Sequence, residues 1–280
     1  MMSSQTLTIV VFSQFTTNHN YLGTVKKKNV YEHPLNERIR NLLRLEYLFA
    51  GMMYRIKGPA EWDSRAVIDN IIEILDFIAR IDFKAELIKD LEHHAQILER
   101  WQRTPNVNTE RLVGLIDKTK ELVERLDNIE GQIEENLSQN QMINLIRQRS
   151  TISGGTSRSD LPGYYYWLQR NPKQRQNKLS EWLAPLMPLR DAIDLNLYLI
   201  RNNAVTSQET ALCGFFKSKL GAKTNYQIIQ VWMPIEHPCY PEIKGGKQHI
   251  TIRFFEQADV EERDRKTEQD VNFELCCCMT

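Results

Sequence analysis

The sequence lacks any apolar stretch of the roughly 20 residues that a bilayer-spanning helix requires. Its short apolar segment at residues 6–12 has no positive charge before it and no clear cleavage site after it, so it does not resemble a signal peptide. We therefore expect no membrane association. Residues 1–29, which include three consecutive lysines, are expected to form a disordered N-terminal extension.

Cysteine is scarce, and no Cys-x-x-Cys pair is present. The five cysteines are Cys213, Cys239, Cys276, Cys277 and Cys278. An odd number with irregular spacing argues against a secreted disulfide framework and against a structural zinc site. His93 and His94 are consecutive on a predicted helix, about 100° apart, and cannot chelate one metal ion together. We expect a cytoplasmic protein that binds no metal.

The motifs of common enzymes are also missing. The sequence has no glycine-rich phosphate loop, no His-Glu-x-x-His motif and no nucleophile elbow. His237 and Cys239 are close in sequence, but no third partner lies beside them. We expect neither catalysis nor a cofactor. The alternative is an enzyme whose catalytic groups converge from distant segments.

Net charge is zero, because 36 basic residues balance 36 acidic ones, which argues against a protein whose whole surface binds nucleic acid. The charges are unevenly distributed along the chain, since acidic residues outnumber basic ones in residues 108–137. Residues 141–178 form a basic flank with only one acidic residue, and its basic members are Arg147, Arg149, Arg158, Arg170, Lys173, Arg175 and Lys178. Such a flank indicates a local acidic partner.

Apolar residues recur with helical spacing through the middle of the chain. Helices are predicted at residues 62–81, 83–101, 110–135, 142–149, 174–183 and 189–201, after a first helix capped by Asn36. Beyond about Ala204, short segments rich in β-branched and aromatic residues predict strands at residues 212–216, 226–233, 249–255 and 271–277. In the third of these strands, Ile250, Ile252 and Phe254 are predicted to face one side.

This segregation predicts an α+β protein. An N-terminal all-helical domain, residues 30–204, is followed by a small, mostly antiparallel β-sheet domain, residues 205–280. Val30 and Tyr31 are expected to add an edge strand to that sheet.

The first helix carries an unusual arginine pair. Arg40 and Arg44 stand four residues apart and therefore share one helix face. Two guanidinium groups suit carboxylate ligands, because each can form two parallel hydrogen bonds. The alternative is a solvated helix face in which Glu37 and Glu46 are the partners. Apolar surface for this helix is expected from Leu35, Ile39, Leu42, Tyr47 and Phe49.

The aromatic run at residues 164–168 lies inside the basic flank. Aromatic side chains beside basic ones can form a base-stacking platform, so a nucleic-acid-binding regulator is the alternative function. The run lacks the glycine-spaced strand motif of common RNA-binding modules, and aromatic clusters are more often core.

Four parts of the chain together resemble a known family. They are residues 32–40 with 43–46, residues 74–77 with 84–91, residues 145–149 with 153–155 and 160–162, and residues 252–254 with 272–277. The first is specific, because Pro34, Asn36, Arg38, Arg40 and Arg44 hold fixed spacings. In these motifs the chain resembles the ZapD family of bacterial Z-ring-associated proteins over about residues 30–277. The segment before Val30 has no counterpart in that family.

The resemblance implies a non-enzymatic homodimer that binds the C-terminal tail of FtsZ, the tubulin-like division protein, and crosslinks FtsZ filaments into bundles. It also implies recruitment from the cytoplasm to the division site at midcell. Carried onto this sequence, the tail-binding candidates are Arg40 and Arg44, with Arg38, Arg147, Arg149 and Arg253. The last three can instead be structural arginines paired with buried carboxylates. Gln141 and His249 stand where a charge is expected.

Overall fold

The computed structural model of the chain describes residues 28–79, 83–102, 109–128, 137, 140–221, 224–246, 248–257 and 263–280. Contacts within the chain divide it into two units. The β unit contains the described residues up to Ile39 and those from Leu199 to Thr280, and the helical unit is Arg40–Tyr198. The predicted extension lies, up to residue 27, outside the described residues.

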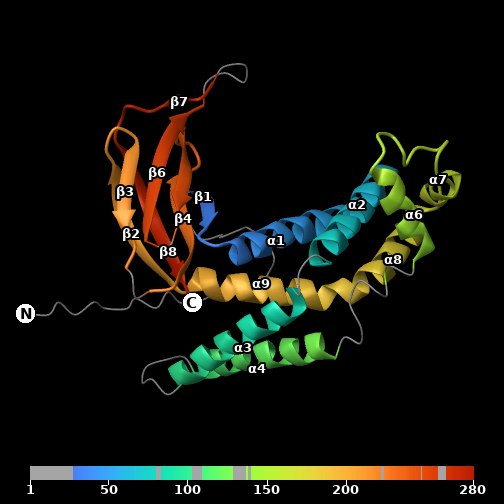
Figure 1. Ribbon diagram of the computed structural model, residues 1–280, viewed down its shortest axis with the longest axis horizontal. Coiled ribbons are helices and arrows are strands. Elements are labelled where there is room, and N and C mark those ends of the chain that lie inside the picture. The colour runs from blue at the N-terminus through green and yellow to red at the C-terminus, as the bar shows by residue number, and fades with distance from the viewer. Residues whose placement is uncertain are drawn as a thin grey trace, which may run out of the picture. The chain divides into compact units, whose positions relative to one another are not determined.

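Helices precede most of the strands along the chain, which confirms the predicted α+β class (Figure 1). The helices are α1 (Glu37–Arg55), α2 (Glu61–Ile78), α3 (Phe83–Gln102), α4 (Thr109–Asp127), α6 (Gln141–Ser150), α7 (Pro162–Leu168), α8 (Pro172–Leu183), the short 3-10 helix η1 (Ala184–Leu186) and α9 (Met187–Asn202). The strands are β1 (Lys28–Pro34), β2 (Ala204–Ala211), β3 (Phe215–Lys219), β4 (Tyr226–Pro234), β5 (Cys239–Gly245), β6 (His249–Glu256), β7 (Arg265–Lys266) and β8 (Val271–Met279). Within the described helices, none is long and apolar enough to cross a bilayer.

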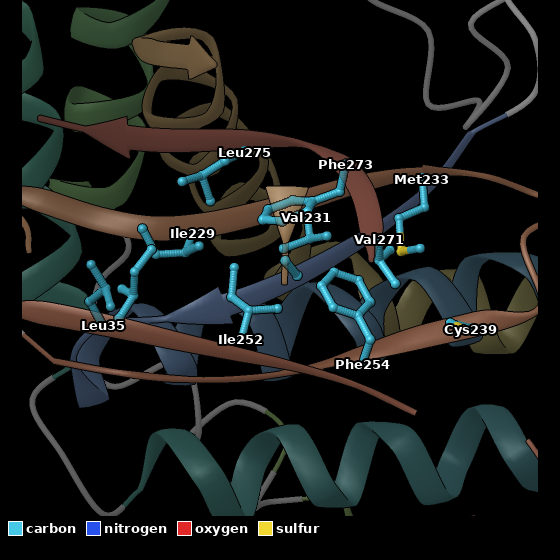
Figure 2. Packing of buried hydrophobic residues seen from close by; sticks show 12 residues of the cluster. Leu35, Ile229, Val231, Met233, Cys239, Ile252, Phe254, Val271, Phe273 and Leu275 are labelled. Atoms are coloured by element: carbon cyan, nitrogen blue, oxygen red, sulfur yellow. The ribbon is translucent and has the colours of Figure 1, made fainter. Parts of the chain in front are cut away.

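The β unit consists of two antiparallel sheets over one hydrophobic core. One sheet has the order β1-β4-β8-β2, and the other has β3-β6-β5 with β7 paired to β6. Ile250, Ile252 and Phe254 are fully buried, as their alternation predicts. Figure 2 shows Ile252 and Phe254 packed among Val231, Phe273 and other residues of the facing sheet.

Strand β1 pairs along its length with β4, which confirms the predicted N-terminal edge strand. Its Glu32 carboxylate receives two hydrogen bonds from the Arg201 guanidinium, at 2.9 and 2.7 Å. The Gln230 side-chain amide of β4 donates to the same carboxylate at 2.7 Å. The bidentate hydrogen bonds are charge-assisted and partly buried, and such bonds are strong. They connect β1 to β4 and to the last turn of α9.

In the helical unit, α3 and α4 form a hairpin (Figure 1). A buried polar group connects α3 to α9, because the Asn196 side chain lies 3.0 Å from His94 Nε2 and donates to Asp90 at 3.2 Å. All three side chains are buried, so each needs these partners. The group therefore specifies how α3 packs on α9.

Arg175 of α8 is buried, although its sequence context placed it in the basic flank. Its Nε donates to Ser64 Oγ of α2 at 3.0 Å. Its terminal nitrogens donate to the carbonyls of Leu168 at 2.8 Å, Pro59 at 2.6 Å, and Arg170. One side chain thus satisfies the backbone at the end of α7 and before α2.

The predicted helices are present with end shifts of a few residues, and residues 80–81 and 129–135 of two predictions lie outside the described residues. The predicted strand at residues 212–216 is wrong in its first half. A tight turn lies there, with φ of 47° at Cys213 and 67° at Gly214. A Cβ on Gly214 would approach the Thr267 carbonyl oxygen to 2.6 Å, so glycine is required at this position. Strands β2, β5 and β7 were not predicted.

The cysteine run lies on β8, and its side chains alternate between the two faces of the sheet. Cys277 packs against the hydrophobic core, and burial raises its pKa to about 11. Cys276 lies on the other face, where a hydrogen bond from Cys278 lowers its pKa to about 7, assisted by Thr206, whose Oγ1 is 3.2 Å from the Cys276 sulfur. Among the three thiols of the run, Cys276 is therefore the one whose pKa is lowered.

We expect Arg175→Met to lower the free energy of unfolding by roughly 3 kcal/mol, because Ser64 and three carbonyls lose a buried donor. Lys173→Ala, on the exposed side of the same helix, is the control and should change it by less than about 0.5 kcal/mol. Urea unfolding followed by circular dichroism measures both variants. Equal stabilities of the two variants would contradict this role of Arg175.

Alkylation of Cys276 by iodoacetamide should follow its lowered pKa. The thiolate is the reactive form, so the rate should rise through pH 7 and level off about one pH unit above it. In Thr206→Val one hydrogen bond to the sulfur is absent, and the midpoint should move to higher pH. Tandem mass spectrometry locates the label, and Thr210→Val on the same strand is the control. If the alkylation rate of Cys276 had its midpoint near pH 8.5, about the pKa of an ordinary thiol, the lowered pKa of Cys276 would be refuted.

Candidate partner-binding site

The helix that carries the arginine pair starts from a fixed position in the β unit. Asn36 Oδ1 accepts a hydrogen bond from the Ile39 backbone N–H at 2.9 Å, which confirms the predicted cap. The Asn36 side-chain amide donates to Gln227 Oε1 at 2.9 Å, and the Leu35 N–H donates to the Gln227 carbonyl at the same distance. The first turn of α1 is therefore held on β4.

Arg40 and Arg44 lie one turn apart on α1, as predicted. Arg44 is exposed and Arg40 is partly exposed. The buried residues of this helix include Leu42, Leu45 and Phe49, on its opposite side. Arg38 is two residues from Arg40, a rotation of about 200°, so it does not belong to the same face.

Arg147 and Arg149 lie on α6, which Asn140 caps through hydrogen bonds to the N–H groups of Met142 and Ile143. Arg147 forms an ion pair with Asp76 of α2. Both side chains of this pair are more than a third exposed, so it contributes only about 0–1 kcal/mol and can exchange for another carboxylate. Arg149 is exposed at the end of the helix.

Arg253 belongs to β6, on the face of its sheet opposite the core. Its guanidinium lies over the Phe215 ring, 4.7 Å from the ring centroid. Phe215 of β3 and Glu242 of β5 are its neighbours in the two adjacent strands. A guanidinium stacked on an aromatic ring can still donate hydrogen bonds from its edge to a planar anion.

The candidates thus fall into three groups. Arg40 and Arg44 share one face of α1, and α6 presents Arg147 and Arg149. Arg38 and Arg253 belong to the β unit. Gln141 and His249, which depart from the expected charge pattern, are both exposed.

The basic flank is less basic at the surface than its sequence suggests. Arg175 is buried, Arg147 is paired with Asp76, and Lys178 pairs with Glu181 at 2.6 Å. Two of the four aromatic side chains of the run, Tyr164 and Trp167, are core, whereas Tyr165 and Tyr166 are exposed. Burial also raises the pKa of Tyr164, against the opposing effect of Arg65. Within this run, the rings left to stack on a nucleic acid are those of Tyr165 and Tyr166.

Tyr47 corrects one expectation from the sequence. It was assigned to the apolar side of the first helix, yet 78% of its surface is exposed, and Tyr54 is 81% exposed. A helical projection explains the error, because Tyr47 lies three residues after Arg44 and therefore on the arginine face. The spacing from Arg44 could therefore have predicted the exposure of Tyr47, although its side chain is largely apolar.

Within the described residues, no group of three histidine, cysteine or acidic side chains is arranged to hold a metal ion.

Comparison with known proteins gives one consistent family. The family model described as ZapD, cell division protein, matches residues 43–253. A protein named cell division protein ZapD from Methylococcus capsulatus is 36% identical over 255 residues, which cover 91% of this chain and all of that protein. Proteins of the same name from Chromobacterium violaceum and Aromatoleum aromaticum are 37% and 35% identical over 248 residues, 89% of this chain and 98% and 96% of theirs.

Proposed function

Because the chain belongs to the ZapD family of cell division proteins, we propose that it acts in division by binding the C-terminal tail of FtsZ and crosslinking FtsZ filaments into bundles. In this proposal it promotes Z-ring assembly at midcell from the cytoplasm, without catalysis. A homodimer supplies two tail sites. Each site can be weak, because many bridges between paired filaments act at high effective concentration.

The observation that supports the proposal is the arginine face of α1. Arg40 and Arg44 are one turn apart, and Arg44 is exposed on a helix whose start is fixed by its cap. Such a pair can receive two carboxylates, or one carboxylate at two places, from an acidic tail. Arg147, Arg149 and Arg253 are the further proposed contacts, since Arg149 is exposed and the other two are partly exposed.

Sedimentation with GTP-assembled FtsZ tests the proposal most directly. The protein should pellet with intact FtsZ and bundle its filaments, but it should not pellet with FtsZ that lacks the C-terminal tail, because the tail is the proposed ligand. Electron microscopy of the same samples shows whether filaments are bundled. A folded sample that pellets with neither form, or equally with both, would refute tail-directed crosslinking.

Arg44→Glu should weaken binding to a tail peptide about tenfold, since a carboxylate ligand loses a charge-assisted contact and meets a repulsive charge. Arg158→Glu makes the same charge change on an exposed loop residue and is the matched control. Fluorescence anisotropy at increasing salt gives the affinities, which should fall as screening shortens the reach of charge to about 10 Å at roughly 0.1 M salt. Equal losses in both variants would mean that only net charge matters.

A further inference from the structure

Two tyrosines on α1 are exposed to an unusual degree. Tyr47 and Tyr54 expose 78% and 81% of their surface, in a helix whose other large apolar side chains are buried or partly buried. Single exposed aromatic residues are normal, so exposure alone assigns nothing. What matters here is their position relative to the arginine pair.

The tyrosines continue the arginine face. At 100° per residue, Arg40, Arg44, Tyr47, Gly51 and Tyr54 fall within an arc of about 80° on α1. The rise of 1.5 Å per residue makes this row about 21 Å long. An extended peptide of about six or seven residues has the same length.

Gly51 lies between the two tyrosines and places no side chain there. A Cβ at this position would make only an ordinary contact, 3.4 Å from the Asn70 side-chain nitrogen. The fold therefore does not require glycine at 51, and glycine inside a helix is less favourable than alanine. With glycine at this position, α1 itself contributes no side chain between the two rings, and the Asn70 side chain lies beside it.

We propose that Tyr47 and Tyr54, named here the tyrosine ledge, bind an apolar side chain of the same acidic peptide whose carboxylates contact Arg40 and Arg44. This inference rests on the proposed function, in which that peptide is the FtsZ tail. Charge complementarity selects an acidic segment for the arginine end of the row. Rigid aromatic rings at the other end offer apolar contact at a low cost in side-chain entropy.

The distance along the row specifies the ligand further. Arg44 and Tyr54 are ten residues apart on the helix, or about 15 Å. An extended chain covers this distance in about four or five residues. The peptide should therefore carry its apolar side chain that far from the acidic group that contacts Arg44.

Anisotropy titration of a labelled FtsZ tail peptide tests the ledge. The double variant Tyr47→Ala/Tyr54→Ala should bind about tenfold more weakly, as expected for aromatic contacts, with an unchanged dependence on salt. Arg44→Glu should instead reduce the salt dependence. Tyr166→Ala is the control, because it removes an aromatic ring that is 69% exposed on α7. The control should bind like the unaltered protein.

The outcomes separate the ledge from the function that it serves. If the double variant binds the peptide normally while Arg44→Glu binds weakly, the ledge is refuted and the tail site stands. If the double variant becomes monomeric in sedimentation velocity but keeps its peptide affinity, the ledge is refuted as a peptide contact, because it holds a second copy of the chain. If the unaltered protein does not bind the peptide, both proposals fail.

Discussion

The pairing of β1 with β4 is the constraint on which the β unit depends. It brings the start of the described chain into the same sheet as β8 near its end. Glu32 strengthens the pairing, since its carboxylate accepts from Arg201 and from Gln230, and Gln230 in turn accepts from the Trp232 indole at 3.0 Å. A partly buried carboxylate with so many donors is strongly held in one geometry. Because α1 begins three residues after β1 ends, the same pairing fixes where the arginine-bearing helix starts.

The spacing of apolar residues correctly predicted the helices and strands that bury one of their faces. The helices around Ile71 and Leu91 and the strand with Ile252 have a clear apolar period, and all of them are present. Of the missed strands, β7 has only two residues, and β2 and β5 are at the edges of their sheets. Their outward residues are polar, and β5 contains Pro241, so neither shows the apolar alternation that signals a strand. Edge strands owe their conformation to a partner strand, which a local sequence pattern does not contain.

At the candidate site, the positions of the arginines on their helices could be predicted from the sequence. Whether each charge is exposed, buried or paired could not. The shared face of Arg40 and Arg44 follows from spacing alone. The burial of Arg175 does not, because its acceptors are the carbonyls of Pro59, Leu168 and Arg170, which any residue type supplies. The pairing of Arg147 with Asp76 joins residues 71 positions apart and is equally invisible locally. Counting charges along a segment therefore overestimates the basic surface that a fold presents.

A row that joins arginines to tyrosines gives a selectivity that arginines alone cannot give. Guanidinium pairs accept any carboxylate-rich segment, and salt screens them. Aromatic rings at a fixed distance add a second requirement, because an acidic segment without an apolar side chain at the matching place loses that contact. Discrimination is the difference between the two binding free energies, so it can be large while each site stays weak. Weak but selective sites would suit the filament crosslinking that we propose, because individual bridges could then exchange while the bundle persists.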